Sequence, residues 1–580
     1  MSTTLCKSVA FMLVFGGATT IVASAAMPAP TIIATVPGTP VRDLGHVAPT
    51  TSIRLAVVLR YRNESDLRAL REAQDDAASP LAGRFLTSEQ FRDAFAPAPY
   101  TYASTMAALQ HAGFTIRATS SNRTVIDVIA PAAIVERYFQ TSIHQVQQTG
   151  VGARYENVAP AYLPSGLQSA VYGVIGFNNL ELTAGRGLRP TNAATAISKA
   201  TTSLEPPVFG PDAGFSPYGF AKAYDFPVNH QRAGAPKGQT YDGTGRATGV
   251  VTNEIYSERD LAAFLNYFGI KRTGPPTTFV DIDLKNQFPR VDADYTTMDA
   301  ETVVGTTPGT ALYLYVIPDF VTSWIIDAYN RAASENAVDA LSSGFFGCES
   351  ELSDFARASN HIAEQAAAEG SVWSAFSGDE GAFLCANGTK PGVATPASGP
   401  SFVGVGGTTL ITTPAGAWRA EWGFAWPGGG LFSAPASSSG GGVSTLFPLP
   451  TYQQGVTNII GTRRNVPDVG FDVSEATGAS LYFQGSWSGP IGAPFDGEGL
   501  SSDLFCSEVT QIDDVRGSRL GPANAKIYRI FKQYGYTGPS GKLFNDAVGY
   551  GNGLYKAIPG YDRVTGIGSI DGWNFAQLVK

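Results

Sequence analysis

The residues that could carry acid–base chemistry in this chain are carboxylates rather than histidines. The chain has 5 histidines, and only His230 and His361 lie beyond residue 216. Neither sits at a predicted strand end beside a serine or cysteine, so a Ser–His–Asp arrangement has little support. An imidazole is charged below its usual pKa of about 6.5 and then accepts no proton, whereas a carboxylate still can. Carboxylates are therefore the acid–base groups to consider for a site that works in acid.

Asp379 follows a predicted strand in a region, 216–580, where strands and helices alternate. Strands are predicted over 247–251, 311–317, 337–341 and 371–377, and helices over 258–268 and 354–369. This order predicts an α/β fold with a mostly parallel sheet and helices on both faces. Functional residues in such sheets gather at the carboxyl ends of the strands, where Asp379 is expected.

A smaller α+β domain is predicted before this region, over 50–180. Its expected strands are 52–59 and 125–129, and its expected helices are 63–74, 87–94 and 132–139. Residues 181–215 lose this periodicity and become rich in Ala, Thr, Gly and Pro, a composition typical of a linker.

The N-terminus has the pattern of a signal peptide. Lys7 precedes an uncharged apolar stretch from residue 9 to residue 22, and Ala23-Ser24-Ala25 has the small-residue form of a cleavage site. The stretch is shorter than the roughly 20 residues that span a bilayer. We therefore expect residues 1–25 to be removed and the protein to be secreted or periplasmic, with no membrane contact afterwards.

Composition limits the partners. The chain has 580 residues, 43% of them hydrophobic, which suits several domains with full cores. Its formal net charge of −9 is the wrong sign for a phosphate-binding surface, so nucleic acid is not an expected partner. Charged residues make up only 15%, and this low content suits a secreted protein in acid because its net charge changes little with pH.

Several motifs in both domains resemble one family, the sedolisins or serine-carboxyl peptidases of S53 type. The similar segments are residues 86–91, 111–114 and 121–125 in the first domain and residues 377–379, 440–444, 466–469 and 560–568 in the second. Their order and spacing are more specific than any one of them. The resemblance implies a subtilisin-like peptidase domain, preceded by a pro-kumamolisin-like activation domain that acts as the enzyme's own pro-domain.

The family's chemistry uses a Glu base and an Asp one helical turn apart, a Ser nucleophile at a helix start, and a second Asp for the oxyanion. By this resemblance Asp299 occupies the helix Asp position and Asp379 the oxyanion position. Four residues before Asp299, about 400° of helical rotation, the family's Glu is replaced by Tyr295. Asp294 lies about 140° round the helix from Asp299, so it could substitute only if the helix started differently.

The nucleophile position is also altered. The ungapped match of residues 497–505 puts Gly499 at the nucleophile and Asp503 at a family Pro. A two-residue shift restores Ser501 as nucleophile but needs a compensating deletion before Arg516. The ungapped register is favoured because it keeps apolar residues at the family's apolar positions. The polar residues of this helix, at 503, 507, 508, 510 and 511, predict that one of its faces is exposed to water.

Two lost groups predict a sedolisin homologue with a degenerate proteolytic site and a retained peptide-binding cleft. Loss of such a nucleophile costs about a million-fold in turnover in related subtilisin chemistry. The expected partners are a polypeptide in the cleft and the chain's own pro-domain, which stays attached. The alternative is an active acid serine-carboxyl endopeptidase with Ser501 as nucleophile and Asp294 or Glu301 as base.

The resemblance further implies a calcium site near the C-terminus. Its carboxylates are Asp546 and Asp562, and backbone carbonyls come from Ala547, Ile558 and Gly560. With a water these give six hard oxygen ligands, which suit Ca²⁺.

A disulfide is expected between Cys348 and Cys385. One cysteine follows the strand that ends at Phe346 and the other follows Asp379, and adjacent parallel strands bring such loops together. Cys6 leaves with the signal peptide. Cys506 is expected to stay reduced in the helix that follows Gly499.

Overall fold

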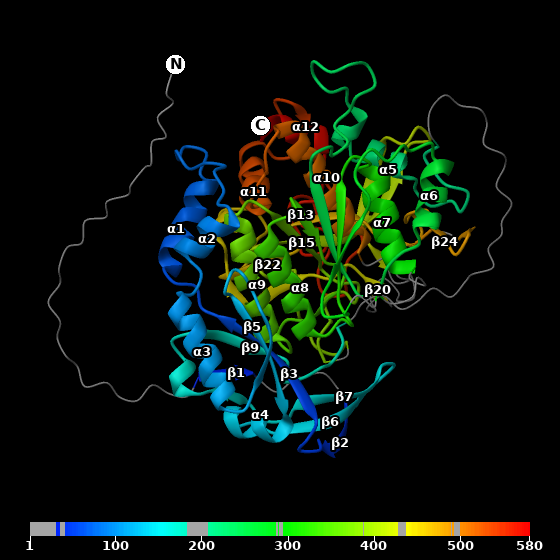
Figure 1. Ribbon diagram of the computed structural model, residues 1–580. Helices are drawn as coiled ribbons and strands as arrows, with labels where there is room; N and C mark the ends of the chain where they lie inside the picture. The colour runs from blue at the N-terminus through cyan, green and yellow to red at the C-terminus, as the bar shows by residue number, and fades with distance from the viewer. Residues whose placement is uncertain are drawn as a thin grey trace.

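The computed structural model describes residues 31–34, 41–182, 207–285, 288, 294–386, 388–426, 437–488, 490–491 and 499–579 (Figure 1). The predicted signal peptide, 1–25, and most of the predicted linker lie outside the described residues. Among the described residues, no helix is both long enough and apolar enough to cross a bilayer.

The first domain is built on an antiparallel sheet in the order β4-β5-β3-β9. β3 and β5 form its centre because their Val, Ile and Leu side chains are buried between the layers on either side. Two smaller sheets, β1-β8 and β2-β6-β7, complete it. The strands are β1 (Thr31–Ala34), β2 (Arg42–His46), β3 (Ser52–Leu59), β4 (Thr115–Thr119), β5 (Val125–Pro131), β6 (Ile143–Gln148), β7 (Gly152–Asn157), β8 (Ala161–Leu163) and β9 (Val171–Ile175); the helices are α1 (Glu64–Asp75), α2 (Ser88–Ala94), α3 (Pro99–His111) and α4 (Ala132–Phe139).

The second domain contains a larger sheet in the order β11-β12-β10-β13-β15-β17-β18, with β23 also paired to β17. All of these pairings are parallel except β17 with β18. Its central strands, such as β10, β13 and β15, are buried along their whole length, as expected for strands covered on both faces. The strands of the sheet are β10 (Ala247–Thr252), β11 (Thr278–Asp281), β12 (Ala311–Val316), β13 (Ala340–Ser342), β15 (Val372–Phe376), β17 (Phe402–Thr412), β18 (Trp418–Gly423) and β23 (Val469–Asp472).

Helices cover both faces of this sheet. In β13, Ala340 packs into the cluster around α10 while its neighbour Leu341 packs into the cluster around α8 and α9, because successive side chains of a strand point to opposite faces. The prediction of a mostly parallel α/β sheet with helices on both faces is confirmed. The helices are α5 (Pro217–Ala223), α6 (Glu258–Tyr267), α7 (Asp294–Thr306), α8 (Thr322–Glu335), α9 (Ser353–Ala368), α10 (Leu500–Arg516), α11 (Ala523–Tyr534) and α12 (Gly572–Leu578).

Short strands lie within the loops at the sheet edges and in the C-terminal region. They are β14 (Gly347–Cys348), β16 (Ala394–Thr395), β19 (Ala425–Trp426), β20 (Ser437–Ser438), β21 (Gly442–Pro448), β22 (Arg463–Val466), β24 (Tyr482–Phe483), β25 (Ser486–Trp487), β26 (Thr537–Gly538), β27 (Gly541–Lys542), β28 (Phe544–Asn545) and β29 (Ser569–Ile570). Single 3₁₀ turns lie at Ser165–Leu167, Pro227–Asn229 and Thr451–Gln453.

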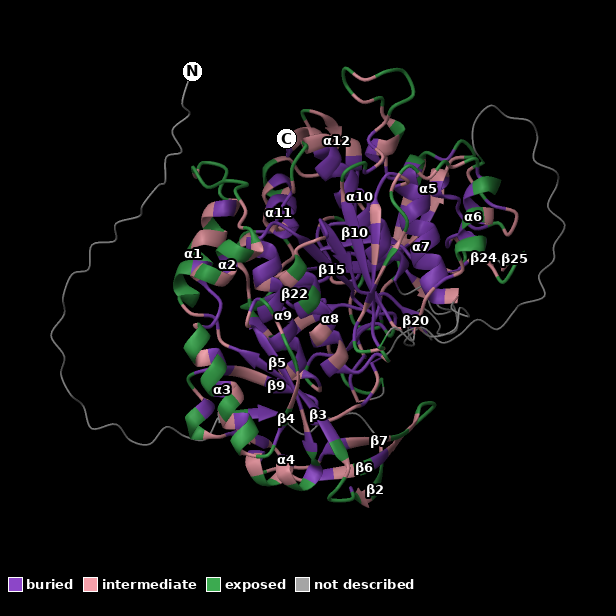
Figure 2. Cartoon of the chain, viewed as in Figure 1, coloured by how far each residue is buried: buried purple, intermediate pink, exposed green. Residues whose placement is uncertain are grey.

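The prediction of a water-exposed face on the helix after Gly499 was wrong. Every residue of α10 from Leu500 to Asp514 is buried, and Figure 2 shows the helix within the buried centre of the molecule. Some of its polar side chains hydrogen-bond to other buried residues. Ser502 hydrogen-bonds to Ser342 and Ser374 at 2.9 and 2.7 Å, and Gln511 donates to the Thr306 carbonyl at 2.9 Å.

The first domain, blue to cyan in Figure 1, packs against α8 and α9 of the second. Ala56, Val58 and Ile175 of the first domain share one hydrophobic cluster with Ile326 of α8 and Phe355 of α9. A backbone hydrogen bond of 3.0 Å from Leu86 to Ala368 also crosses between the domains.

Candidate functional site

The contact between α7 and α10 brings Asp299 next to Gly499. Asp299 lies in the middle of α7, and Gly499 is the residue on which α10 begins. A Cβ atom added to Gly499 would lie 3.1 Å from Asp299 Oδ1, so a side chain at 499 would point at this carboxyl group. The residue facing Asp299 from the start of α10 therefore carries no hydroxyl.

Tyr295 lies one turn before Asp299 and fills the space beside Gly499. Its hydroxyl donates a 2.9 Å hydrogen bond to the carbonyl of Gly344, which follows β13. A Cβ atom on Gly344 would lie 2.7 Å from this hydroxyl and 2.8 Å from the Cα atom of Gly499. The two glycine backbones and the tyrosine are thus in direct contact, and a side chain at 344 has no room.

Asp503 is the partner that Asp299 finds instead of a glutamate. Their carboxyl groups lie within hydrogen-bonding reach of each other, while the Ser342 hydroxyl donates to Ser502 at 2.9 Å and not to Asp503. As carboxylates both groups would offer acceptors only, so a hydrogen bond between them requires one of them to hold a proton. Burial raises the pKa of both carboxyls, and the negative charge of Asp503 raises that of Asp299 further. Both causes favour a state in which the pair holds one proton.

The alternative nucleophile, Ser501, lies on the same helix as Gly499 but is buried, and its hydroxyl has no hydrogen-bond partner among the described residues.

The two alternative bases, Asp294 and Glu301, lie at different positions on α7. Asp294 is the first residue of α7 and accepts a 2.9 Å hydrogen bond from the amide of Tyr295. Glu301 lies about 200° round α7 from Asp299, and its carboxylate accepts a 3.0 Å hydrogen bond from the amide of Tyr482. Burial raises the pKa of Glu301.

Asp379 lies just beyond the carboxyl end of β15, next to β13 in the sheet and hence at the same edge as Gly344. Gly378 before it has φ +93°, a turn that favours glycine. The backbone carbonyl of Asp379 accepts hydrogen bonds from the Ser438 amide at 2.6 Å and the Ser437 hydroxyl at 2.9 Å. The residue is buried at the site's edge.

Asp546 and Asp562 both face the loop of residues 558–560. Asp562 accepts a 3.1 Å hydrogen bond from the Ile558 amide and Asp546 a 3.2 Å hydrogen bond from the Gly560 amide. Neither carboxylate forms an ion pair with a cationic side chain in the described part of the chain. Burial raises the pKa of Asp562 to about 7 and that of Asp546 in the same direction.

This donor set fits a hard divalent cation. The carbonyls of Ile558 and Gly560 accept no hydrogen bond from another described residue, and the carbonyl of Ala547 accepts only a long one, at 3.4 Å, from Thr565. A buried carboxylate and a half-buried one without a cationic partner, beside carbonyl oxygens with little or no other hydrogen bonding, are ligands of the kind that Ca²⁺ takes. Asp546 and Asp562 would hold such an ion, and its charge would offset the cost of burying both groups.

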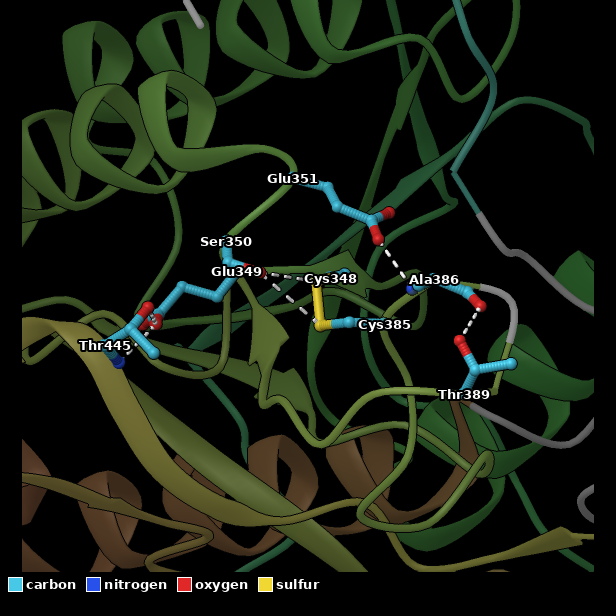
Figure 3. The surroundings of a disulfide bond; sticks show 8 residues. All are labelled: Cys348, Glu349, Ser350, Glu351, Cys385, Ala386, Thr389 and Thr445. Carbon is cyan, nitrogen blue, oxygen red and sulfur yellow. Dashed lines mark hydrogen bonds between the residues drawn. A yellow bond between two sulfur atoms is a disulfide. The ribbon is translucent and has the colours of Figure 1, made fainter. Parts of the chain in front are cut away.

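The predicted disulfide is present: Cys348 and Cys385 are joined, with their Cα atoms 5.2 Å apart (Figure 3). Cys348 belongs to β14, which pairs with β16, and Cys385 lies in the loop after Asp379. Glu351 completes a cluster with the two sulfurs, but sulfurs bonded to each other offer no thiolate to a metal. Cys506 is a buried free thiol whose pKa is raised by burial.

The residues that the sequence left unnoticed here are Asp503 as a partner of Asp299, and Gly344. The signal for Asp503 was its spacing: it lies four residues after Gly499, so both occupy one face of α10. Gly344 gave no signal, because its need to be glycine arises only from the contact with Tyr295 and Gly499.

The sheet, its covering helices and the α7–α10 contact define a subtilisin-like peptidase fold with carboxylates in place of histidine. The solved structure of Pseudomonas sedolisin, a serine-carboxyl proteinase complexed with two molecules of pseudo-iodotyrostatin, matches with a TM-score of 0.54 and 28% identity, covering 64% of this chain and 99% of that one. A family profile described as the activation domain of pro-kumamolisin matches residues 40–180.

Two curated proteins match over most of their lengths. Sedolisin of Pseudomonas sp. (strain 101) is 28% identical over 548 residues, 91% of this chain and 87% of that protein. Kumamolisin of Bacillus sp. (strain MN-32) is 25% identical over 557 residues, 93% of each chain. This chain is thus similar to sedolisins over most of its length, and its residues 40–180 match the pro-kumamolisin activation domain.

Proposed function

We propose that this protein is an exported sedolisin homologue whose proteolytic site is degenerate and whose cleft still binds polypeptide. Its activation domain, over 50–180, stays joined through the linker of 181–215 to the peptidase-like domain of 216–580. The observation that carries the proposal is Gly499: the position that faces Asp299 from the start of α10 has no side chain. A nucleophile is absent where a carboxylate base could reach it.

Two further contacts support the proposal. Tyr295, at the family's glutamate position, donates its hydroxyl proton to the Gly344 carbonyl and cannot act as a base at acidic pH. Asp299 is engaged with Asp503, a residue that replaces a family proline. The substituted positions are therefore in contact with one another, as expected where a chain has readjusted after losing a function.

Calcium and export belong to the same proposal. The carboxylates of Asp546 and Asp562 fit Ca²⁺, which would hold the loop-rich C-terminal region on the sheet. The disulfide is stable in an oxidising compartment, which agrees with the predicted signal peptide. The polypeptide that occupies the cleft is expected to be bound without being cut.

The test is to hold the purified full chain near pH 4 with calcium and to follow its intact mass and the hydrolysis of a denatured protein. We expect no self-cleavage and no hydrolysis. The control is Ser501→Ala, which leaves this result unchanged if the site is degenerate. Cleavage by the natural chain that disappears in Ser501→Ala would overturn the proposal and establish an active acid endopeptidase.

A restored variant tests the cleft separately. The double variant with Tyr295→Glu and Gly499→Ser restores the family's glutamate and serine. The double variant with Tyr295→Glu and Gly499→Ala is its matched control, because it lacks the serine hydroxyl. Hydrolysis by the serine-containing double variant, but not by its alanine control, would show that the cleft still positions a substrate.

Equilibrium binding of the same denatured protein to the natural chain, measured by anisotropy, should be detectable. If neither binding nor restored hydrolysis is observed, the proposal that the cleft is retained is refuted.

A further inference from the structure

His361 of α9 is stacked between two tyrosine rings of the activation domain. Its imidazole lies 3.9 Å from the ring centroid of Tyr61 at an interplanar angle of 22°, and 4.0 Å from that of Tyr172 at 9°. Tyr61 follows β3, and Tyr172 lies in β9. The histidine belongs to the peptidase-like domain, so this three-ring stack joins the two domains.

A hydrogen bond fixes the histidine in the stack. Its Nε2 atom lies 3.0 Å from the carbonyl oxygen of Leu59, the last residue of β3, and donates to it. The side chain is buried. The imidazole is therefore held on both faces and at one edge by the activation domain, and these contacts exist only while the domains are docked.

The charged groups around the stack come from both domains. Arg60 and Glu64 face it from the activation domain, and Arg357 and Glu364 face it from α9. Glu369, just beyond α9, acts on Tyr61. Burial raises the pKa of Glu364, so this group loses its charge on acidification earlier than an exposed glutamate.

Docking opposes protonation of His361. Burial is the main cause that lowers its pKa to about 3, and the charge of Arg60 acts in the same direction, while the bond to Leu59 opposes it. Two phenol faces attract an imidazolium and offset part of this effect. Once the domains separate, the imidazole is in water with an ordinary pKa of about 6.5. A group whose pKa is lowered in the docked state stabilises docking above about pH 6.5, and this contribution is lost as the pH falls toward 3.

We propose that His361 is the contact through which acid loosens the activation domain from the peptidase-like domain, reversibly and without cleavage of the chain. The domains separate around the stack, and the linker keeps them joined so that they dock again at neutral pH. The inference concerns the domain contact and does not depend on whether the substituted site can cut peptide bonds.

A second set of interdomain contacts lies away from the stack and responds to pH through carboxylates. Arg54 of β3 lies over Trp324 of α8, 3.5 Å from the ring centroid, and pairs with Asp327 of α8 across the interface and with Asp127 of β5 in its own domain. Burial raises the pKa of Asp127, so any change of this group on undocking acts in the opposite direction to that of His361. A test must therefore separate the histidine from the carboxylates.

The experiment is hydrogen–deuterium exchange on the full chain at pH 7 and pH 4, corrected for the intrinsic exchange rate. The amide of Leu86, which donates to Ala368 of the other domain, reports docking. The amide of Val57, inside the β3–β5 ladder, reports folding of the activation domain itself. In the natural chain we expect the protection of Leu86 to fall on the order of 100-fold between pH 7 and pH 4, while that of Val57 falls much less.

His361→Phe keeps a ring in the stack and removes the titrating group. Its Leu86 protection should change at most about 10-fold between the two pH values, the remainder coming from the carboxylates. His111→Phe, at the exposed end of α3, is the matched control and should behave as the natural chain does. An equal pH dependence in His361→Phe and the natural chain, or tighter docking at pH 4 than at pH 7, overturns the proposal.

A measurement on the natural chain covers the case in which His361→Phe fails to fold. Exchange of the imidazole C2 hydrogen, followed by mass spectrometry, reports the pKa and the exposure of each histidine. We expect slow exchange at His361 from pH 5 to pH 8 with no midpoint in that range, and faster exchange at the exposed His111. A midpoint near pH 6.5 at His361 would overturn the proposal.

Discussion

Two regions of this protein each place two carboxyl groups in partly or fully buried positions, and the contacts of these groups differ. At the α7–α10 contact, the carboxyl groups of Asp299 and Asp503 lie within hydrogen-bonding reach of each other. In the loop formed by residues 546–562, Asp546 and Asp562 accept hydrogen bonds from backbone amides and face carbonyl oxygens. The first pair is neutralised by a shared proton, whereas the second offers the ligands for a cation.

The local backbone explains this difference. Asp299 lies in the middle of α7, where the neighbouring amides already donate within the helix and leave none for a carboxylate, and the oxygens of Asp503, in the first turn of α10, accept no hydrogen bond from a described amide. Gly560 has φ +87°, which turns the loop so that its amide reaches Asp546. Carboxyl groups on packed helices must therefore find a proton or each other, while carboxylates beside an irregular loop can keep their charge.

The largest effect is expected from Gly344→Ala, which acts on the first region only. The new Cβ atom would lie 2.7 Å from the Tyr295 hydroxyl and 2.8 Å from the Gly499 Cα atom. Since backbone must move, we expect a loss of about 3 kcal/mol in the free energy of unfolding, measured by denaturant titration.

Gly560→Ala is the matched change in the second region. There the new Cβ atom would lie 3.5 Å from Asn458 Nδ2, an ordinary contact, and the loss comes from the positive φ alone. That loss should be about 1–2 kcal/mol. If Gly344→Ala is no more destabilising than Gly560→Ala, the close packing of Gly344, Tyr295 and Gly499 is refuted.

Chelation of calcium tests the second region. If Asp546 and Asp562 hold the ion, calcium at 100 times its dissociation constant stabilises the fold by about 2.7 kcal/mol, and a chelator removes this amount. The melting temperature near pH 7, with and without chelator, measures the effect. Asp562→Asn should abolish the difference between the two curves, whereas Asp503→Asn should leave it in place. Identical curves for the natural chain would contradict the calcium assignment.

The sequence predicted the parts of this molecule that depend on local pattern. The predicted strand at 52–59 coincides with β3, and the predicted helix at 258–268 differs from α6 by one residue. α3 was not predicted, since its apolar residues are spread around the helix and only a few are buried. The bridge between Cys348 and Cys385 was predicted because parallel strands bring their following loops together.

The parts that were not predicted depend on partners that are distant in sequence. The polar residues of α10 suggested an exposed face, but Ser502 and Gln511 find their partners on β13, β15 and α7. The same holds for Asp503, whose partner Asp299 lies on another helix. A polar residue in one helix does not reveal whether water or a second polar residue will meet it.

Asp503→Asn tests the shared proton in the first region. A carboxyl whose pKa is raised in the folded state stabilises the fold below its unfolded pKa, near 4, and this contribution is lost as the pH rises through the folded pKa. The natural chain should therefore lose stability from about pH 5 to pH 8. An asparagine amide donates to Asp299 without needing a proton, so the variant should be about 1–2 kcal/mol more stable relative to the natural chain at pH 8 than at pH 5.

The measurement is the free energy of unfolding at both pH values, with Asp66→Asn, at an exposed position of α1, as the control outside the pair. A pH dependence in Asp503→Asn equal to that of the natural chain would refute the shared proton. The result bears on the comparison directly, because only the first region is expected to depend on a proton held between two carboxyl groups.

The smallest expected effect is that of a side chain at Gly499, and here the order of two variants is the test. In Gly499→Ala the methyl group would lie 3.1 Å from Asp299 Oδ1 and 3.6 Å from Asp503 Oδ2, so the Asp299 carboxyl must shift by a few tenths of an ångström. Gly499 has φ −72° and ψ −24°, which alanine adopts freely, so the backbone adds no strain. We expect a net loss of about 0.5–1 kcal/mol at pH 5.

Gly499→Ser adds the same Cβ atom and a hydroxyl that can donate to Asp299. The added hydrogen bond should recover about 0.5–1 kcal/mol, so the serine variant is more stable than the alanine variant although it is larger. Denaturant titrations of the two variants side by side measure this order. A serine variant that is less stable than the alanine variant would mean that the side chain at 499 does not reach Asp299, and the nucleophile position would then have to be sought elsewhere on α10.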